Sequence, residues 1–130
     1  MPSPLFSADN KIQLLVCGQA YFPKLIAAID AAKISIYFET YILRIDDVGQ
    51  AVCDALIRAD ERGVAVSVII DWLGTGSKEC HRIAALFKHT SIHFRLFNPW
   101  FRRGWARSHR KLCVVDREVA FVGGININDD

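Results

Sequence analysis

Apolar and polar residues in the first half of the chain follow two different periods. In segments 21–32 and 48–62 the apolar residues recur at helical spacing, which predicts two amphipathic helices. Segments 12–16 and 34–42 are short and rich in β-branched and other apolar residues, which predicts strands. Segment 64–72 is almost wholly apolar, a pattern typical of a strand buried on both faces. We therefore expect this last strand to be central in a sheet.

The second half of the chain predicts one more helix, one more strand and a hairpin. Ser77 is placed to cap a helix that runs to Lys88, and segment 92–97 has the composition of a strand. Runs 112–115 and 119–122 are apolar and flank a polar segment, which predicts two strands joined by a tight turn. The residues expected to face inward from the helix are Ile83, Ala84 and Phe87.

Strands that alternate with helices predict an α/β fold, with a mixed, largely parallel sheet flanked by helices. A length of 130 residues fits one domain, residues 1–130, and an apolar content of 52% suits a well-buried sheet. Ligands of such sheets collect at the carboxyl ends of strands, where Glu39 and Asp71 are expected to lie. Asp71 leaves a strand for a glycine-containing loop, so we expect it to be a helix cap or turn residue.

The predicted hairpin gathers polar residues that suit a phosphate site. If its turn centres on residues 117–118, Lys111 pairs with Gly124 and His109 pairs with Asn126. All four side-chain positions then fall on one face, because strand side chains alternate and cross-strand partners share a side. Gly124 leaves room for a phosphate to approach the backbone, and Asn126 can donate a hydrogen bond to it.

The chemistry expected of this face follows from its residue types. A neutral imidazole can attack phosphorus and form a covalent intermediate, so His109 is the candidate nucleophile. Lys111 brings a positive charge to the non-bridging oxygens, and Asn126 adds a neutral donor. Neither Lys111 nor Asn126 needs a cofactor for this role.

Two carboxylates near this face have open roles. Asp116 falls on the opposite side of the strand by parity, so the residues alone give it a structural role in holding the hairpin turn. The carboxylate that orients His109 is then either Glu39 or a residue beyond the end of this chain. A carboxylate in a buried strand needs a partner. The partner of Glu39 could be His109 or Lys111. A salt bridge to an arginine with no catalytic part is an equally good interpretation.

The spacing of these residues resembles a known signature. His109, Lys111, Asp116, the glycine pair 123–124 and Asn126 match the HxKxxxxD…G(G/S)xN pattern of the phospholipase D superfamily. The resemblance implies cleavage or exchange of phosphodiesters through a phosphohistidine, without a metal, and it makes Asp116 part of the catalytic motif.

Within this superfamily, the upstream sequence resembles the amino-terminal half of bacterial cardiolipin synthases. The stretches that carry the resemblance are ISIYFETYIL (34–43), ADERGV (59–64) and VSVIIDWLGT (66–75). It implies a phosphatidyl transfer in which a second phospholipid, such as phosphatidylglycerol, supplies the accepting hydroxyl. It also implies a peripheral position at the cytoplasmic face of a bacterial inner membrane, with phospholipid and the anionic membrane surface as partners.

The synthases carry two His-Lys-Asp motifs, whereas this chain has one. We expect the chain to be one half of a two-motif enzyme, truncated at its C-terminus, and inactive or nearly so without its acid partner. Alternatively, two copies pair as a homodimer, as in the short single-motif endonucleases of the superfamily. A homodimeric phosphodiesterase or nuclease and a non-catalytic lipid-binding module are the alternative functions.

Segment 97–107 concentrates cations and large aromatic residues directly before His109, although the formal charge of the whole chain is only +2. Arginine attracts anionic head groups and tryptophan prefers membrane interfaces, which favours a lipid-surface loop. The same composition suits nucleic acid, which we consider the weaker hypothesis. Ordinary packing of the tryptophans beside solvated arginines is a further interpretation. The residues concerned are Trp100, Arg102, Arg103, Trp105 and Arg107.

The four cysteines show neither a CxxC pair nor metal-ligand spacing with the histidines, so we expect buried free thiols. We find no secretory leader pattern and no apolar run long enough to cross a bilayer, which predicts a soluble or peripheral segment.

Overall fold

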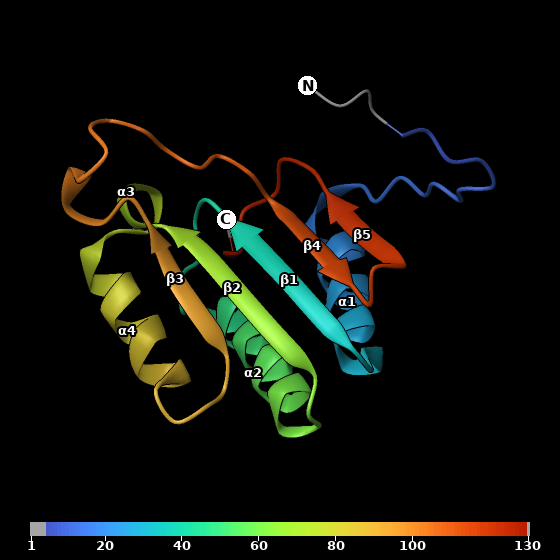
Figure 1. Cartoon of the computed structure of the whole chain (residues 1–130), viewed down its shortest axis with the longest axis horizontal. Coiled ribbons are helices and arrows are strands. Elements are labelled where there is room, and N and C mark those ends of the chain that lie inside the picture. The colour runs from blue at the N-terminus through green and yellow to red at the C-terminus, as the bar shows by residue number, and fades with distance from the viewer. Residues whose placement is uncertain (1–4, 130) are drawn as a thin grey trace.

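The computed structural model describes residues 5–129, and its centre is a five-stranded sheet in the order β3-β2-β1-β4-β5 (Figure 1). The pairs β1–β2 and β2–β3 are parallel, and the pairs β1–β4 and β4–β5 are antiparallel. The α/β class and the mixed sheet are therefore confirmed, with parallel pairing in half of the strand pairs. The strands are β1 (Ser35–Thr40), β2 (Ala65–Asp71), β3 (His93–Phe97), β4 (Leu112–Val115) and β5 (Val119–Val122).

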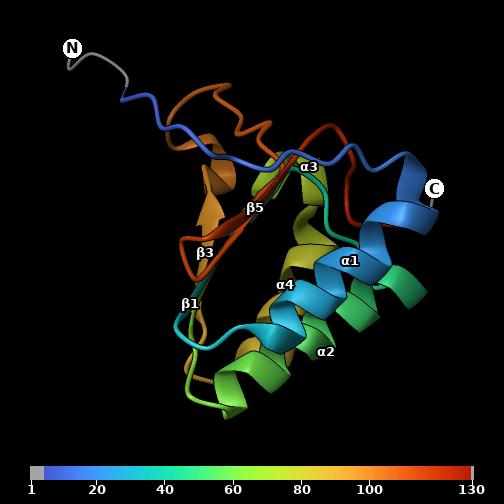
Figure 2. The same cartoon turned by 90° about the vertical axis from the view of Figure 1, so that its right-hand side faces the viewer.

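The longer helices lie on one side of this sheet, as the edge-on view in Figure 2 shows. Their apolar faces meet alternate strand residues such as Ile36, Val68 and Ile70, and together these form the core. On the opposite face Tyr37 and Val122 are exposed. The helices are α1 (Cys17–Ala31), α2 (Asp47–Glu61), α3 (Trp72–Thr75), α4 (Ser77–Phe87) and the 3₁₀ turn η1 (Pro99–Phe101).

Strand β2 therefore differs in part from the sequence prediction. It is an interior strand with partners on both edges, as expected, but β1 is the middle strand of the sheet. Its burial alternates, with Val66, Val68 and Ile70 inward and Ile69 only half-buried. The expectation of burial on both faces was wrong within residues 5–129, because no helix covers the second face.

The predicted strand 12–16 is absent. These residues have no regular structure, and Ile12 and Leu14 are almost fully exposed. Apolar composition alone does not form a strand, since a strand needs a partner for its backbone N–H and C=O groups. Helix α1 instead begins at Cys17, four residues earlier than expected, and Cys17 is exposed whereas the other three cysteines are buried free thiols.

The start of α4 also differs from the prediction. Ser77 is the first helical residue and does not cap, because Gly76 occupies the N-cap position at φ +89°. Ile83 and Phe87 are buried as expected, but Ala84 is exposed. Cys80 takes its place on the buried face, one turn before Ile83.

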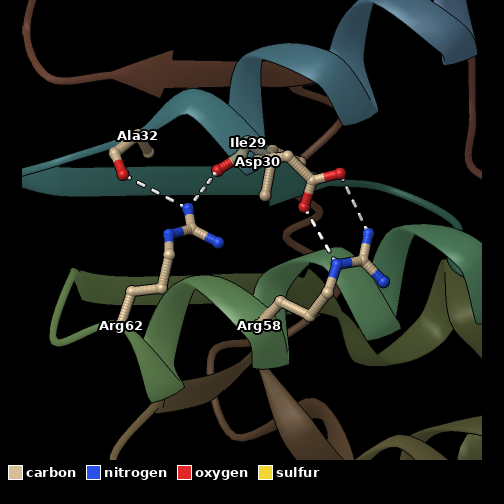
Figure 3. Close-up of polar contacts among 5 residues, drawn as sticks. All are labelled: Ile29, Asp30, Ala32, Arg58 and Arg62. Atoms are coloured by element: carbon tan, nitrogen blue, oxygen red, sulfur yellow. Dashed lines mark hydrogen bonds and ion pairs between the residues drawn. The ribbon is translucent and has the colours of Figure 1, made fainter.

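Two arginines of α2 fasten α1 to α2 (Figure 3). The Arg62 guanidinium donates to the carbonyl oxygens of Ile29 at 2.8 Å and Ala32 at 3.2 Å. These carbonyls lie at the end of α1, where intrahelical donors run out. Arg58 forms a two-point pair with Asp30, at 3.0 and 3.1 Å. The contacts fix the end of α1 from which β1 starts.

The turn between β4 and β5 has three residues, 116–118, instead of a centre at 117–118. Val115 pairs with Val119, so the register is shifted by one from the prediction. Asp116 and Arg117 both have positive φ, at 54° and 57°. Aspartate tolerates this left-handed conformation better than most residues.

Asp116 has the expected structural role, but it does not hold its own turn. Its carboxylate accepts backbone hydrogen bonds from Lys33, Ile34 and Ser35, the nearest at 2.7 Å, and so anchors the start of β1 to the hairpin. The N–H groups of Ser35, Ile34 and Lys33 stabilise the charged form and hold the pKa of this carboxyl below its usual value.

We expect Asp116→Asn to lower the melting temperature at neutral pH and to flatten its dependence on pH in acid. A carboxyl whose pKa is depressed in the folded state stabilises the fold above its unfolded pKa, about 3.9. That stabilisation is lost as the pH falls through the folded-state pKa. Melting temperatures measured from neutral pH down to pH 2 check this, with Asp54→Asn as the control because Asp54 bonds only a side chain on its own helix. If the melting temperatures of Asp116→Asn and of the unsubstituted protein changed with pH in the same way, the role of the Asp116 carboxylate would be contradicted.

Gly49, in the first turn of α2, is a position where only glycine fits. A Cβ atom there would overlap the carbonyl oxygen of Arg44 and lie 2.7 Å from its carbonyl carbon. Because this obstacle is backbone, we expect Gly49→Ala to lower the free energy of unfolding by about 3 kcal/mol or more. Gly123→Ala is the matched control in urea denaturation, since nothing lies within 4 Å of its Cβ position. Equal losses in the two variants would refute this explanation.

Candidate active site

His109 and Lys111 lie together where the long loop after β3 reaches β4 (Figure 1). The Lys111 Nζ atom is 3.2 Å from Nδ1 and 3.3 Å from Nε2 of His109, and it donates to the His109 carbonyl oxygen at 3.1 Å. His109 is exposed, whereas Lys111 is only 6% exposed. The expected shared face is thus confirmed for these two residues, with an accessible imidazole beside a fixed ammonium group.

Tyr41, just beyond β1, forms the wall of this site and was missed in the sequence analysis. Its ring centroid is 4.6 Å from that of His109, and Lys111 Nζ is 5.5 Å from its centre. The Tyr41 carbonyl accepts a hydrogen bond from Thr75 Oγ1 at 3.1 Å, and a Cβ on Gly74 would lie 2.6 Å from the same oxygen. The close packing of α3 against Tyr41 therefore holds the ring against the imidazole.

Glu39 contacts both neighbours of His109 instead of its ring. One carboxylate oxygen accepts a hydrogen bond from the Ser108 hydroxyl, and the other is 3.9 Å from an Arg110 nitrogen. The arginine interpretation of Glu39 is therefore the one that the structure supports, with Ser108 as an additional partner. Within residues 5–129 Glu39 forms neither a hydrogen bond nor an ion pair with His109 or Lys111, and it acts on the position of the imidazole through the neighbouring Ser108 and Arg110.

Asp71, at the end of β2, caps a helix as expected and also binds the site loop. One oxygen accepts from the Gly74 backbone N–H at 2.9 Å, which caps α3. The other accepts from the backbone N–H of Ser108 at 2.7 Å, although 37 residues separate the two. Asp71 is 2% exposed, so both bonds form away from water. This carboxylate fixes the chain one residue before His109.

We expect Asp71→Asn to lower the free energy of unfolding by about 2–3 kcal/mol, because the amide can accept only one of the two N–H groups and presents a donor to the other. Urea denaturation measures the loss. Asp54→Asn, which affects a surface side-chain bond, should cost less than about 0.5 kcal/mol. A loss at Asp71 no larger than at Asp54 would show that the buried carboxylate does not hold the loop.

The structure corrects the expected positions of Gly124 and Asn126. Strand β5 ends at Val122, and it is Gly123 that faces Lys111, donating its N–H to the Lys111 carbonyl at 3.3 Å. The chain then turns away, so that Ile127 forms a parallel bridge with Leu43. The expected pairings of Lys111 with Gly124 and of His109 with Asn126 are therefore wrong. The three-residue turn shifts the register by one residue, and the pairing of the hairpin ends before residue 124 is reached.

Asn126 still reaches the site end of the sheet by another route. Its neighbour Ile127 donates to the Ile42 carbonyl and accepts from Arg44, both at 3.0 Å, so Asn126 lies beside the segment that follows Tyr41. Its side-chain oxygen is buried without a hydrogen-bond partner. Asp116 lies at the opposite end of β4, and the structure does not bring it to His109 and Lys111.

The loop before His109 is organised by aromatic rings in tilted and T-shaped contacts. Trp72 packs on Trp100 at 5.2 Å and on Phe101 at 5.5 Å, and Phe101 packs on Trp105 at 4.9 Å between ring centroids. Trp100 and Trp105 nevertheless stay 67% and 77% exposed. The Asn98 side chain ties the loop together through the N–H of Arg103 and the carbonyls of Gly104 and Ala106. The loop exposes large apolar surface beside the exposed cations Arg102, Arg103 and Arg107.

Residues 25–130 match the family described as "Cardiolipin synthase, PLD-like domain". The chain belongs to this family. It is 37% identical over 123 residues to cardiolipin synthase B of Escherichia coli K12, an alignment that covers 90% of this chain and 30% of that protein. It is 35% identical over 124 residues to cardiolipin synthase 1 of Bacillus anthracis, covering 91% of this chain and 24% of that one. The PLD-like domain thus spans less than a third of these relatives.

The fold agrees with this membership. Nuc, a phospholipase D family member from Salmonella typhimurium, superimposes with a TM-score of 0.68 at 24% identity, covering 82% of this chain and 64% of that chain. NucT from Helicobacter pylori superimposes with a TM-score of 0.60 at 21% identity, covering 82% and 66%. The resemblance to the phospholipase D superfamily is confirmed.

Among residues 5–129, histidine, cysteine, aspartate and glutamate nowhere cluster in threes as a metal site would require. No helix in the same range has both the length and the apolar character to cross a membrane.

Proposed function

We propose that this PLD-like domain supplies the nucleophile of a phosphatidyltransferase that forms cardiolipin from phospholipids. The observation that carries the proposal is the contact between the Lys111 ammonium and the exposed His109 imidazole, in a chain 37% identical to cardiolipin synthase B. The proposed substrate is an anionic phospholipid phosphodiester, such as that of phosphatidylglycerol. The proposed location is the cytoplasmic face of a bacterial inner membrane, with the domain bound peripherally.

The proposed reaction has two displacements at phosphorus. A nitrogen of neutral His109 attacks in line, an N–P bond forms, and the P–O bond to the leaving alcohol breaks as that oxygen takes a proton. The hydroxyl of a second phospholipid then attacks the phosphohistidine, losing its proton as the N–P bond breaks. Lys111 stabilises the negative charge on the non-bridging oxygens in both steps. We propose Asn126 as a further phosphate ligand, because its amide nitrogen carries two donors and the residue lies beside the segment that follows Tyr41.

Proton transfer to the leaving alcohol requires a general acid. We propose that a second His-Lys-Asp motif supplies it, from a further part of the protein or from a second copy of this chain. The first source is supported by the 30% share of cardiolipin synthase B that this chain covers. The exposed Trp100 and Trp105, next to Arg102 and Arg103, support contact of the site edge with an anionic lipid surface.

Product analysis tests the proposed substrate. The protein, with the partner motif supplied, is incubated with labelled phosphatidylglycerol in mixed micelles and, separately, with single-stranded DNA. Formation of labelled cardiolipin and release of glycerol are expected, with the DNA left intact. Cleavage of DNA without cardiolipin would overturn the lipid assignment in favour of a homodimeric nuclease.

A further inference from the structure

A pocket of about 340 Å³ lies beside the aromatic loop, on the sheet face that the helices leave open. Its walls come from β2, β3 and the loop that follows β3. Three of its lining side chains are arginines, Arg95, Arg102 and Arg103, and no acidic side chain lines it. Arg102 and Arg103 belong to the loop already described, whereas Arg95 of β3 has had no part in the site of His109 and Lys111.

The positive charge in this pocket is not neutralised within the part of the chain that the structure describes. The ion pairs found there involve Arg58, Arg82 and Arg110, and none of the three pocket arginines. Arg95 donates only its Nε to His93 Nε2, at 2.8 Å, which leaves the two terminal nitrogens of its guanidinium for a ligand. Three guanidinium groups held close together repel one another unless an anion joins them. Planar guanidinium groups match the oxygens of a phosphate.

The pocket is also shaped before any ligand binds. Asn98, which is 8% exposed and has positive φ, holds the loop through three hydrogen bonds. Arg102 and Arg103 of this loop line the same cavity as Arg95 of β3. Ile69, Leu96, Phe97 and Pro99 supply an apolar floor. A cationic rim above an apolar floor suits a phosphate attached to a glyceryl group.

The surroundings of the pocket favour lipid over nucleic acid. The large aromatic rings of the loop pack on one another in tilted and T-shaped contacts, with centroids within 5.5 Å, and do not form a parallel stack. Trp100 and Trp105 stay 67% and 77% exposed, and this apolar surface beside the arginines suits insertion at the level of lipid head groups.

The pocket is separate from His109. Its lining residues come from β2, β3 and the loop at 98–103, and they include none of His109, Lys111 and Tyr41. A phosphate in the pocket is therefore a second phosphate, not the one that His109 attacks.

We propose that the pocket of Arg95, Arg102 and Arg103 binds the head-group phosphate of an anionic phospholipid, in addition to the phospholipid that reacts at His109. The phosphate chemistry follows from the pocket itself, and the choice of lipid as its source rests on the proposed function. The site holds a lipid next to the reacting one, at the edge where the aromatic loop meets the membrane.

Nuclear magnetic resonance of the isotope-labelled protein tests the pocket directly. Dihexanoyl phosphatidylglycerol, kept below its micelle concentration, should shift the signals of β3 and of residues 98–103. Arg95→Gln should weaken this binding about tenfold, the loss expected for one charged phosphate contact. The double variant Arg102→Gln/Arg103→Gln should weaken it further and does not alter the sheet. Inorganic phosphate and dihexanoyl phosphatidylcholine should bind more weakly than phosphatidylglycerol.

The controls separate this proposal from the catalytic one. Arg117→Gln removes the same charge from the β4–β5 turn at the far end of the sheet and should leave binding unchanged. His109→Ala should also leave it unchanged, so failure of the transfer reaction does not affect the result. Equal affinities of Arg95→Gln and Arg117→Gln would overturn the site. Equally tight binding of inorganic phosphate would exclude lipid as its ligand, and displacement of phosphatidylglycerol by oligothymidylate would assign the pocket to nucleic acid.

Discussion

Replacing His109 with alanine is expected to reduce phosphatidyl transfer by on the order of 10⁴-fold or more, which is the size of loss seen when an enzyme loses a covalent nucleophile. The reason is that, in the part of the chain that the structure describes, Lys111 Nζ contacts the ring of His109 and of no other histidine, so no other imidazole is placed to replace it. Initial rates of cardiolipin formation from labelled phosphatidylglycerol measure the effect, with the partner motif supplied.

His89→Ala is the matched control for this experiment. His89 is exposed, follows α4 and is remote in sequence from the loop, so its loss should leave the rate unchanged. Circular dichroism and melting temperature should match the unsubstituted protein in both variants, because His109 is also exposed. A His109→Ala protein that transfers at the normal rate would rule out the proposed nucleophile.

Replacing Lys111 with methionine should lower kcat by about 10²–10³-fold, the usual effect of removing one group that stabilises transition-state charge. Methionine keeps the length of a side chain that is only 6% exposed, so the fold should survive. Lys111→Arg should recover part of the rate because it keeps the charge but changes the geometry. Steady-state kinetics measure kcat and KM separately.

The expected signature is a fall in kcat with a smaller change in KM, because the charge on the phosphate oxygens grows toward the transition state. Lys88→Met is the control, since Lys88 is exposed at the end of α4. A rise in KM alone would assign Lys111 to substrate binding instead of to the chemical step.

The hairpin shows what the sequence could and could not predict. Its strand bounds, Leu112–Val115 and Val119–Val122, are those expected from the apolar runs. The register was wrong by one residue because Asp116 adopts a left-handed conformation that composition does not reveal. The reason for that conformation is tertiary, since it directs the carboxylate to the N–H groups of Lys33, Ile34 and Ser35.

The site was predictable only where it depends on local spacing. His109 and Lys111 are two residues apart in an extended segment, so alternation alone places them on one side. Tyr41 contacts His109 and Asp71 contacts Ser108, and both contacts join residues at least 37 positions apart, which no local pattern encodes. Glu39 was correctly singled out as a carboxylate in need of a partner, but its partners emerged only from the fold.

The most direct test is a single-turnover reaction with the p-nitrophenyl ester of phosphatidic acid. Nitrophenolate leaves as an anion without a proton, so this substrate tests attack by His109 without requiring the general acid of a second motif. We expect a burst of nitrophenolate stoichiometric with the protein and a phosphatidyl adduct on His109, identified by mass spectrometry of its peptides. The burst should be absent in His109→Ala and unchanged in His89→Ala. The absence of a burst in the unsubstituted protein, or an undiminished burst in His109→Ala, would show that His109 is not the nucleophile.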